Sequence, residues 1–315
     1  MIYLILFLIS LATTYLIQIY SIKKSIMDIP NERSSHTTPT PRGGGLSIII
    51  VFYIGLFVFK TSIDYELFLA LFTALPIAII SLIDDIKPVS SKIRLLIQSL
   101  SASVALYLLG GVSSMDFIYF ELSGYWLNII ALISIVWLTN LYNFLDGIDG
   151  YAGSQTVIVG LGLFLFSSNP LGLVLVVGSL GFLLFNWDKA TIFMGDVGSA
   201  TLGFIIAIFI FSDIGTGNIY IWLITLSLFW IDATATLIRR YIAGESISLA
   251  HRKHAYQRLV QAGWTHSRVV IFATVFNLFF LFFLTILDSR IVFFINIIVI
   301  LFFLYLVERK KSFQC

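Results

Sequence analysis

The chain has 315 residues, of which 59% are hydrophobic and only 11% are charged, and its formal net charge is +2. Soluble domains carry about 25% charged residues, so this composition excludes an ordinary soluble protein and predicts an integral membrane protein. The basic residues form no patch dense enough to bind nucleic acid. The single cysteine, Cys315, excludes an intrachain disulfide and a metal site built from thiolates.

Apolar runs predict a single all-α membrane domain over residues 1–315, with about 10–11 transmembrane helices. A helix needs about 20 mostly apolar residues to span the hydrocarbon core, and several of the runs are shorter than that. In chain order the runs are 2–20, 45–59, 66–83, 94–110, 125–142, 154–168, 171–186, 199–212, 219–238, 269–286 and 291–307. The turn at Asn169–Pro170 predicts a tight hairpin between two of them.

The basic residues predict the orientation of the spans. Lysines follow the first run and do not precede it, which argues for a retained first span with a periplasmic N-terminus and against a cleaved signal peptide. With that orientation, all of the 19 Lys and Arg residues except Lys60 and Arg290 fall on the cytoplasmic side. The polar inner segments are then about 21–44, 84–93, 143–153, 187–198 and 239–268, so we expect the active site at the cytoplasmic face.

Acidic residues at the ends of predicted spans indicate a cation site. Asp84 and Asp85 are adjacent carboxylates at the end of one span, where they repel each other unless a cation neutralises them. Mg²⁺ takes oxygen ligands and commonly bridges carboxylates to phosphates. Asp196 stands between two glycines at the start of another span, where a helix N-terminus favours its charged form. A solvated helix end and a simple N-cap are the structural alternatives.

The most specific stretch runs from Asn140 to Asp149. Asn140, Asn143 and Asp146 recur every three residues, so a continuing helix would place them on one stripe, with Asp149 one step further on. Nearby glycines permit close approach of the backbone to a ligand. A calcium-binding loop is the competing interpretation, but its alternating ligands and closing glutamate are missing.

Two further inner segments carry groups suited to phosphate oxygens. Arg42 precedes three glycines whose N–H groups can approach an anion, although a flexible turn explains the glycines equally well. His36 lies just before this turn, and a lone histidine is more often a bystander than a ligand. His251 and His254 would share a helix face, and with Arg252 they suit phosphate better than zinc, because no carboxylate or thiolate lies beside them in the sequence. A loop that is basic because it is cytoplasmic is the alternative.

Together these stretches resemble the polyprenyl-phosphate N-acetylhexosamine-1-phosphate transferase superfamily, of the glycosyltransferase family 4 type. The resemblance runs in the family's order from Asp28 to Arg258. It rests on Pro-Arg42-Gly-Gly, Asp84-Asp85, Asn140-x-x-Asn143-x-x-Asp146-Gly-Ile-Asp149-Gly, Phe193-Met-Gly-Asp196-x-Gly-Ser and the late histidine loop. Pro30-Asn-Glu-Arg-Ser-Ser-His36 and His251-Arg-Lys-His254-Ala-Tyr-Gln257 look closest to the O-antigen-initiating branch. The peptidoglycan branch has consecutive histidines where Arg252 and Lys253 stand here.

The resemblance implies an enzyme of the bacterial inner membrane that moves an N-acetylhexosamine 1-phosphate from a UDP-sugar to undecaprenyl phosphate and releases UMP. It also implies Mg²⁺, or Mn²⁺ in its place, and the family leads us to expect a homodimer. Asp85 and Asp196 would bind the metal, and Asp84 would take the proton of the lipid phosphate or help to hold the metal. The implied substrate-binding residues are Asn140, Asn143, Asp146, Asp149, Lys92, Arg42, His36, His251, Arg252 and His254.

Two other classes of membrane protein remain as alternatives. A CDP-alcohol phosphotransferase carries Asp-x-x-Asp-Gly-x-x-Ala-Arg, of which Asp146-x-x-Asp149-Gly matches only the opening; Gly153 and Ser154 replace the final pair. A transporter would place ionisable groups near the middle of the bilayer, whereas only Asp232 sits clearly inside a predicted span.

Overall fold

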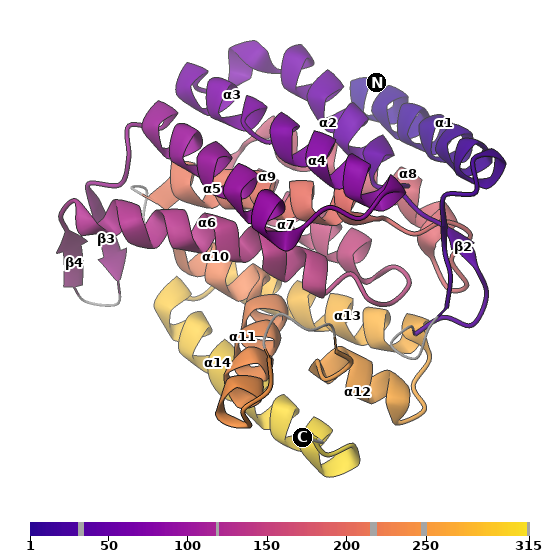
Figure 1. Cartoon of the computed structure of the whole chain (residues 1–315). Helices are drawn as coiled ribbons and strands as arrows, with labels where there is room; N and C mark the ends of the chain where they lie inside the picture. The colour runs from indigo at the N-terminus through magenta and orange to yellow at the C-terminus, as the bar shows by residue number, and fades with distance from the viewer. Residues whose placement is uncertain (31–34, 118–119, 215–218, 247–250, 314–315) are drawn as a thin grey trace.

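The structure is a computed structural model that describes residues 1–30, 35–117, 120–214, 219–246 and 251–313. Residues 31–34, part of the run that carries the branch resemblance, lie outside the described residues. The helices are α1 (Ile2–Lys23), α2 (Leu46–Val58), α3 (Tyr65–Phe72), α4 (Leu75–Ile86), α5 (Ser91–Leu108), α6 (Trp126–Phe144), α7 (Tyr151–Ser167), α8 (Pro170–Asn186), α9 (Asp196–Asp213), α10 (Ile219–Thr225), α11 (Ser227–Ile242), α12 (Ala255–Gln261), α13 (His266–Leu284) and α14 (Ser289–Lys310). They pack into one helical bundle (Figure 1).

Strands are confined to two short antiparallel pairs among the described residues. β1 (Met27–Asp28) pairs with β2 (Thr40–Pro41), with Met27 opposite Pro41. β3 (Ser114–Phe117) pairs with β4 (Phe120–Ser123) in a hairpin between α5 and α6. The all-α membrane class predicted from composition is therefore confirmed.

Each of the eleven predicted apolar runs falls on a helix or a helix pair. By length and composition, six of the described segments could cross a membrane: α1, the α3–α4 segment, α6, α9, α13 and α14. The α10–α11 pair, bent by 72°, would make a seventh, while α2, α7 and α8 are apolar but shorter. The predicted count of 10–11 thus includes helices that are shorter than a full span.

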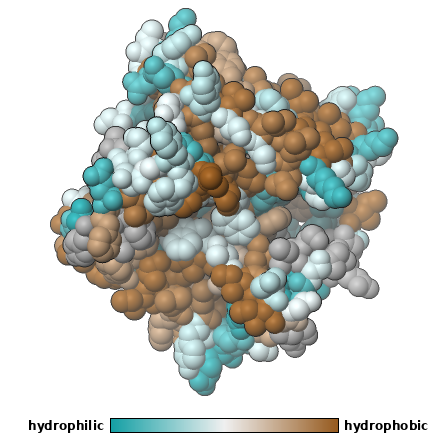
Figure 2. All heavy atoms as spheres, turned by 60° about the vertical axis from the view of Figure 1, so that its left-hand side comes forward, coloured by the Kyte–Doolittle hydropathy of each residue, from teal (hydrophilic) through white to brown (hydrophobic). Residues whose placement is uncertain are grey.

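Helix α9 forms the centre of the bundle, and 83% of its residues are buried. It packs against α4 and α6, and Gly203 permits the closest contact, since a Cβ there would lie 2.7 Å from the Leu138 carbonyl. The predicted α7–α8 hairpin is confirmed, with Pro170 in the first turn of α8. Outer helices expose large apolar side chains such as Leu16 and Phe302, and brown apolar areas cover much of the face in Figure 2.

The packing brings the last residues of α4 to the first residues of α9. The glycine turn before α2 lies against the same point, because a Cβ on Gly45 would meet the Gly198 Cα at 2.4 Å. Backbone N–H groups of Gly44 and Gly45 also donate to the carbonyls of Phe193 and Met194, at 2.9 and 2.8 Å. Polar segments that are far apart in the sequence therefore meet at one end of α9.

Candidate functional site

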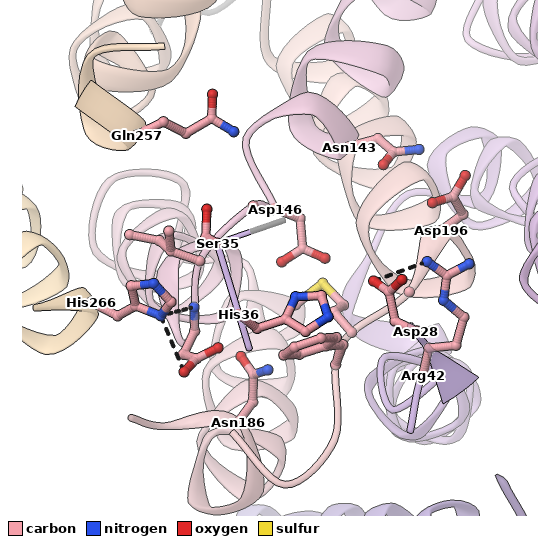
Figure 3. Close-up of a pocket in the computed structure, with 16 residues that line it drawn as sticks. Asp28, Ser35, His36, Arg42, Asn143, Asp146, Asn186, Asp196, Gln257 and His266 are labelled. Atoms are coloured by element: carbon pink, nitrogen blue, oxygen red, sulfur yellow. Dashed lines mark hydrogen bonds and ion pairs between the residues drawn. The ribbon is translucent and has the colours of Figure 1, made fainter. Parts of the chain in front are cut away.

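A cavity of about 350 Å³ opens where these polar segments meet (Figure 3). Its walls come from the β1–β2 segment, the loop after α6, the loop between α8 and α9, α12 and the start of α13. The lining residues are Asp28, Ser35, His36, Arg42, Asn143, Asp146, Gly147, Ile148, Asp149, Asn186, Phe193, Met194, Gly195, Asp196, Gln257 and His266. Six of the residues predicted from sequence, Arg42, His36, Asn143, Asp146, Asp149 and Asp196, are among them.

Asp85 fixes the start of α9 behind the cavity wall. Its two carboxylate oxygens accept the backbone N–H groups of Asp196 and Val197, each at 3.0 Å, and the residue is 6% exposed. Gly195, with a φ of +74°, lies against this carboxylate, and a Cβ at that position would be 2.6 Å from Asp85 Oδ2. Only glycine fits there, which accounts for the Met-Gly-Asp sequence.

Arg94 joins two of the three predicted catalytic aspartates. Its Nη1 donates to Asp84 Oδ2 at 2.6 Å and to Asp196 Oδ2 at 2.7 Å. Asp84 also accepts the Val89 N–H at 2.6 Å. Lys92 is the basic residue predicted for this region, but it is exposed and does not line the cavity. Arg94 has no feature in the sequence that distinguishes it from its basic neighbours.

Asp146 faces the cavity from the loop after α6 (Figure 3). Burial, followed by the negative charges of Asp196 and Asp85, holds the pKa of the Asp146 carboxyl well above its usual range. A bound cation would offset this repulsion. Asn143 lines the cavity beside it, whereas Asn140 turns away and donates to Gln98 Oε1 at 2.7 Å and to the Val136 carbonyl at 2.8 Å.

Asp149 is held by His266, a residue that the sequence interpretation missed. Nδ1 of His266 lies 3.1 Å from Asp149 Oδ2 and 3.3 Å from the Asp149 backbone N (Figure 3). The same carboxylate accepts the Ala190 N–H at 3.2 Å. His266 begins α13, just after the Thr265 N-cap. It follows the predicted histidine loop by 12 residues, so only the folded chain identifies it as a site residue.

Arg42 and His36 border the opposite side of the cavity. Arg42 pairs with Asp28 at 3.3 Å. The His36 ring meets the Phe193 ring edge-on, with a centroid separation of 4.8 Å. Within the described residues neither His36 Nε2 nor Arg42 Nε has a hydrogen-bond partner, and both atoms are buried. Both residues therefore retain unused hydrogen-bonding capacity next to the cavity.

The residues predicted in the late histidine loop do not line the cavity; they are His251, Arg252 and His254. His254 lies 3.7 Å from Asp232 through Nδ1, and His251 packs against His254 with ring centroids 4.8 Å apart. Arg252 is exposed, and its carbonyl accepts Gln261 Nε2 at 2.7 Å. Gln257 is the residue of this segment that lines the cavity. Substrate binding by the two histidines and Arg252 stays a prediction.

The site offers carboxylate and amide oxygens, which are the ligand atoms that Mg²⁺ prefers. Among the described residues, no three His, Cys, Asp or Glu side chains come close enough together to hold a metal ion by themselves. Mg²⁺ is usually held by one or two carboxylates, waters and substrate phosphates, and not by a cage of protein ligands. Asp196, which lines the cavity beside Asn143, fits that mode. Asp85 fits it poorly, because it does not line the cavity and both of its oxygens accept backbone N–H groups.

Comparison with known proteins gives the same family as the motifs. Glycosyl transferase family 4 matches residues 67–213. The chain is 31% identical to a probable undecaprenyl-phosphate N-acetylglucosaminyl 1-phosphate transferase of Bacillus subtilis (strain 168), with 84% of this chain and 79% of the relative covered.

Two other relatives extend the comparison. The decaprenyl-phosphate N-acetylglucosaminephosphotransferase of Mycobacterium leprae (strain TN) is 28% identical, with 77% of this chain and 72% of the relative covered. The phospho-N-acetylmuramoyl-pentapeptide-transferase of Thermotoga petrophila is 30% identical, with 76% and 82% covered. The chain therefore belongs to glycosyl transferase family 4, within the superfamily of polyprenyl-phosphate N-acetylhexosamine-1-phosphate transferases, and is a multi-pass membrane phosphoglycosyltransferase.

Proposed function

We propose that the protein transfers an N-acetylhexosamine 1-phosphate from a UDP-sugar to undecaprenyl phosphate and releases UMP. The product would be the first lipid-linked intermediate of a cell-envelope polysaccharide such as O-antigen, made at the cytoplasmic face of a bacterial inner membrane. The observation that carries the proposal is the convergence of Asp84, Asp196 and Arg94 beside a cavity lined by Asp146 and Asn143. The names of the relatives support a hexosamine phosphate donor and a polyprenyl phosphate acceptor.

The proposed reaction exchanges one phosphoanhydride bond for another. An oxygen of the lipid phosphate attacks the phosphorus that carries the sugar, and the bond from that phosphorus to the UMP oxygen breaks. Transfers of this kind depend mainly on positioning and charge stabilisation. We assign the proton of the lipid phosphate to Asp84, whose carboxylate is already oriented by Val89 N–H and Arg94.

Mg²⁺, when bound, would neutralise the pyrophosphate oxygens and so favour departure of UMP. Asp196 is the proposed ligand, with Mn²⁺ as a substitute for Mg²⁺. The sequence-based choice of Asp85 as a second ligand is not kept, because both of its oxygens bind the backbone at the start of α9. Asn143, Asp146 and Asp149 would orient the nucleotide and the pyrophosphate, and Arg42 would hold a phosphate oxygen. Arg94 keeps the carboxylates of Asp84 and Asp196 in place on one side of the cavity.

The test is an assay of purified protein with labelled UDP-N-acetylglucosamine, undecaprenyl phosphate and Mg²⁺. We expect UMP and a lipid-linked sugar pyrophosphate, and a panel of UDP-N-acetylhexosamines will identify the sugar. A burst of UMP without the lipid would show an aspartyl intermediate, whereas its absence, with Asp84→Asn inactive, would show direct attack. Absence of UMP with every UDP-sugar would refute the proposed function. CDP-alcohol substrates and a transport assay test the two alternatives.

A further inference from the structure

Asp232 is a buried acid that has no part in the proposed chemistry. It lies in α11, six residues after Leu226, where α10 and α11 meet at 72°. The residue is 5% exposed and does not line the cavity. An ionisable side chain inside a membrane segment is costly unless its charge is satisfied, so its retention calls for a function.

The carboxylate of Asp232 binds the first residue of α12. Its two oxygens share the backbone N–H of Ala255, at 2.8 and 2.9 Å. Thr236 Oγ1 donates to the same carboxylate at 3.1 Å, and His254 Nδ1 lies 3.7 Å away. A carboxylate that accepts several hydrogen bonds fixes the backbone it binds more strongly than a neutral acceptor would.

The next two residues of α12 contact the loop after α6, and the second of them, Gln257, also lines the cavity. Tyr256 Oη donates to the Phe144 carbonyl at 3.2 Å, at the point where α6 leads into the Asp146 loop. Gln257 accepts the His254 N–H through Oε1 at 3.3 Å. Its Nε2 faces the loop, since a Cβ on Gly147 would lie 3.2 Å from that nitrogen. Figure 3 shows the Gln257 amide at the rim of the cavity.

The bend before α11 is itself fixed by side chains from other helices. Gln155 Nε2 of α7 donates to the Thr225 carbonyl at 2.7 Å, and Asn277 of α13 donates to Gln155 Oε1 at 2.9 Å. Trp230 Nε1 donates to the Leu223 carbonyl at 2.9 Å. Carbonyls left without helical partners inside a membrane need such donors. The position of Asp232 is therefore set by the core of the bundle.

We propose that Asp232 is a positioning residue, which anchors α12 to the bent helix so that Gln257 presents its Nε2 donor to an oxygen of the bound nucleotide sugar. The anchor also holds His254, the N-cap residue of α12, beside Asp232, which assigns that histidine to the support of the loop. The identity of the ligand that Gln257 binds rests on the proposed function, but the anchoring of α12 by Asp232 does not.

The first experiment measures the position of α12 without any substrate. In a Cys315→Ser background, a Gln257→Cys variant is treated with a maleimide, and the labelling rate is measured in native membranes. Gln257 is 8% exposed, so we expect slow labelling while Asp232 is present. Asp232→Ala should raise the rate about 10-fold by local opening of α12. Asp232→Asn should restore most of the protection, because its amide oxygen can still accept the Ala255 N–H.

A buried position in α9 provides the matched control. Ala200→Cys, 2% exposed in the native chain, should stay unlabelled in both Asp232 variants. Labelling of Gln257→Cys that is unchanged by Asp232→Ala would overturn the proposal. Equal exposure of Ala200→Cys would also overturn it, because the substitution would then have loosened the whole bundle.

The second experiment tests whether Asp232 acts through Gln257. Asp232→Ala and Gln257→Ala should each raise KM for the UDP-sugar about 10-fold with a smaller change in kcat, as expected for loss of a ground-state hydrogen bond. The double variant should be no worse than the poorer single variant, because both remove the same contact. Additive losses would refute the coupling. If the native enzyme uses no UDP-sugar, the proposed function fails, and the labelling experiment still decides the anchoring.

Discussion

Two charged clusters, the carboxylates beside the cavity and the late loop between α11 and α13, differ in how their charges are compensated. Beside the cavity, Asp84 and Asp196 share Arg94, and within the described ranges the hydrogen bonds to the Asp85 carboxylate come from backbone N–H groups. Burial, followed by repulsion from the neighbouring carboxylates, raises the pKa of Asp146. The described part of this cluster thus carries more carboxylate than cationic charge, and it faces a cavity.

At the late loop, the basic side chains of Arg240, Lys253 and Arg258 each pair with a carboxylate of the protein. Glu245 pairs with both Arg240, at 2.9 Å, and Lys253. Arg258 donates to Glu308 of α14 at 2.7 Å. Charges paired in this way stabilise a loop and leave less capacity for a ligand. A high number of charged residues in a sequence segment therefore does not identify the site, whereas an excess of carboxylates beside a cavity does.

The largest expected effect comes from the unbalanced cluster. Asp196→Asn should lower kcat at least about 100-fold, because loss of an electrostatic contact made in the transition state has effects of this size. UMP release is the measurement. Asp116→Asn, an exposed position in β3, is the control and should keep native activity. An Asp196→Asn enzyme with native kcat would remove the carboxylate cluster from the mechanism.

Arg94 and Lys92 offer the next comparison, since they lie two residues apart on α5. Arg94→Gln removes the cation between Asp84 and Asp196, so we expect a loss of about 10-fold or more in kcat/KM, in line with an unpaired buried charge. Lys92→Gln changes an exposed side chain and should lower kcat/KM less than twofold, within the small range usual for surface charges. The reverse order would restore the sequence-based choice of Lys92.

Two histidines distinguish the cavity from the late loop at a smaller scale. His266→Ala should raise KM for the UDP-sugar about 10-fold, because Asp149 loses a hydrogen-bonding partner. His251→Ala should change KM less than twofold, since His251 does not line the cavity. Steady-state kinetics of both variants will check this. A larger effect of His251→Ala would place the late loop in substrate binding after all.

The smallest effect concerns stability and pH. Burial, with the nearby His254 and Arg240, lowers the pKa of His251 from 6.5 to about 4. Between these values the unfolded chain binds a proton that the folded chain does not, so folded-state stability falls as the pH is lowered from about 6.5 towards 4. Thermal unfolding in detergent should show a lower Tm at pH 5 than at pH 7. In His251→Gln that difference should shrink; an unchanged difference would assign it to other groups.

Sequence reasoning succeeded where the determinant is local. Apolar run length located every long helix within a few residues, because burial of a helix in lipid depends on about 20 consecutive side chains. The motifs placed Asp146, Asp149 and Asp196 at the ends of predicted helices, and in the structure all three line one cavity. The expected helix through His251 and His254 was wrong, because α12 begins only at Ala255, and the 72° bend before α11 was not predicted. Their stability comes from contacts such as Ala255 with Asp232 and Thr225 with Gln155, and these have no local signal.

The sequence by itself therefore determined the membrane class, the long helices, the family and the stretches that carry the chemistry. Only the tertiary structure decided which of several similar residues face the cavity. Arg94 meets Asp196 across 102 residues and His266 meets Asp149 across 117, while Lys92 lies exposed and His254 lies against Asp232. The reason is physical: the rotation of a helix and the path of a loop are fixed by packing against distant segments, so neighbours in the sequence can point to opposite sides.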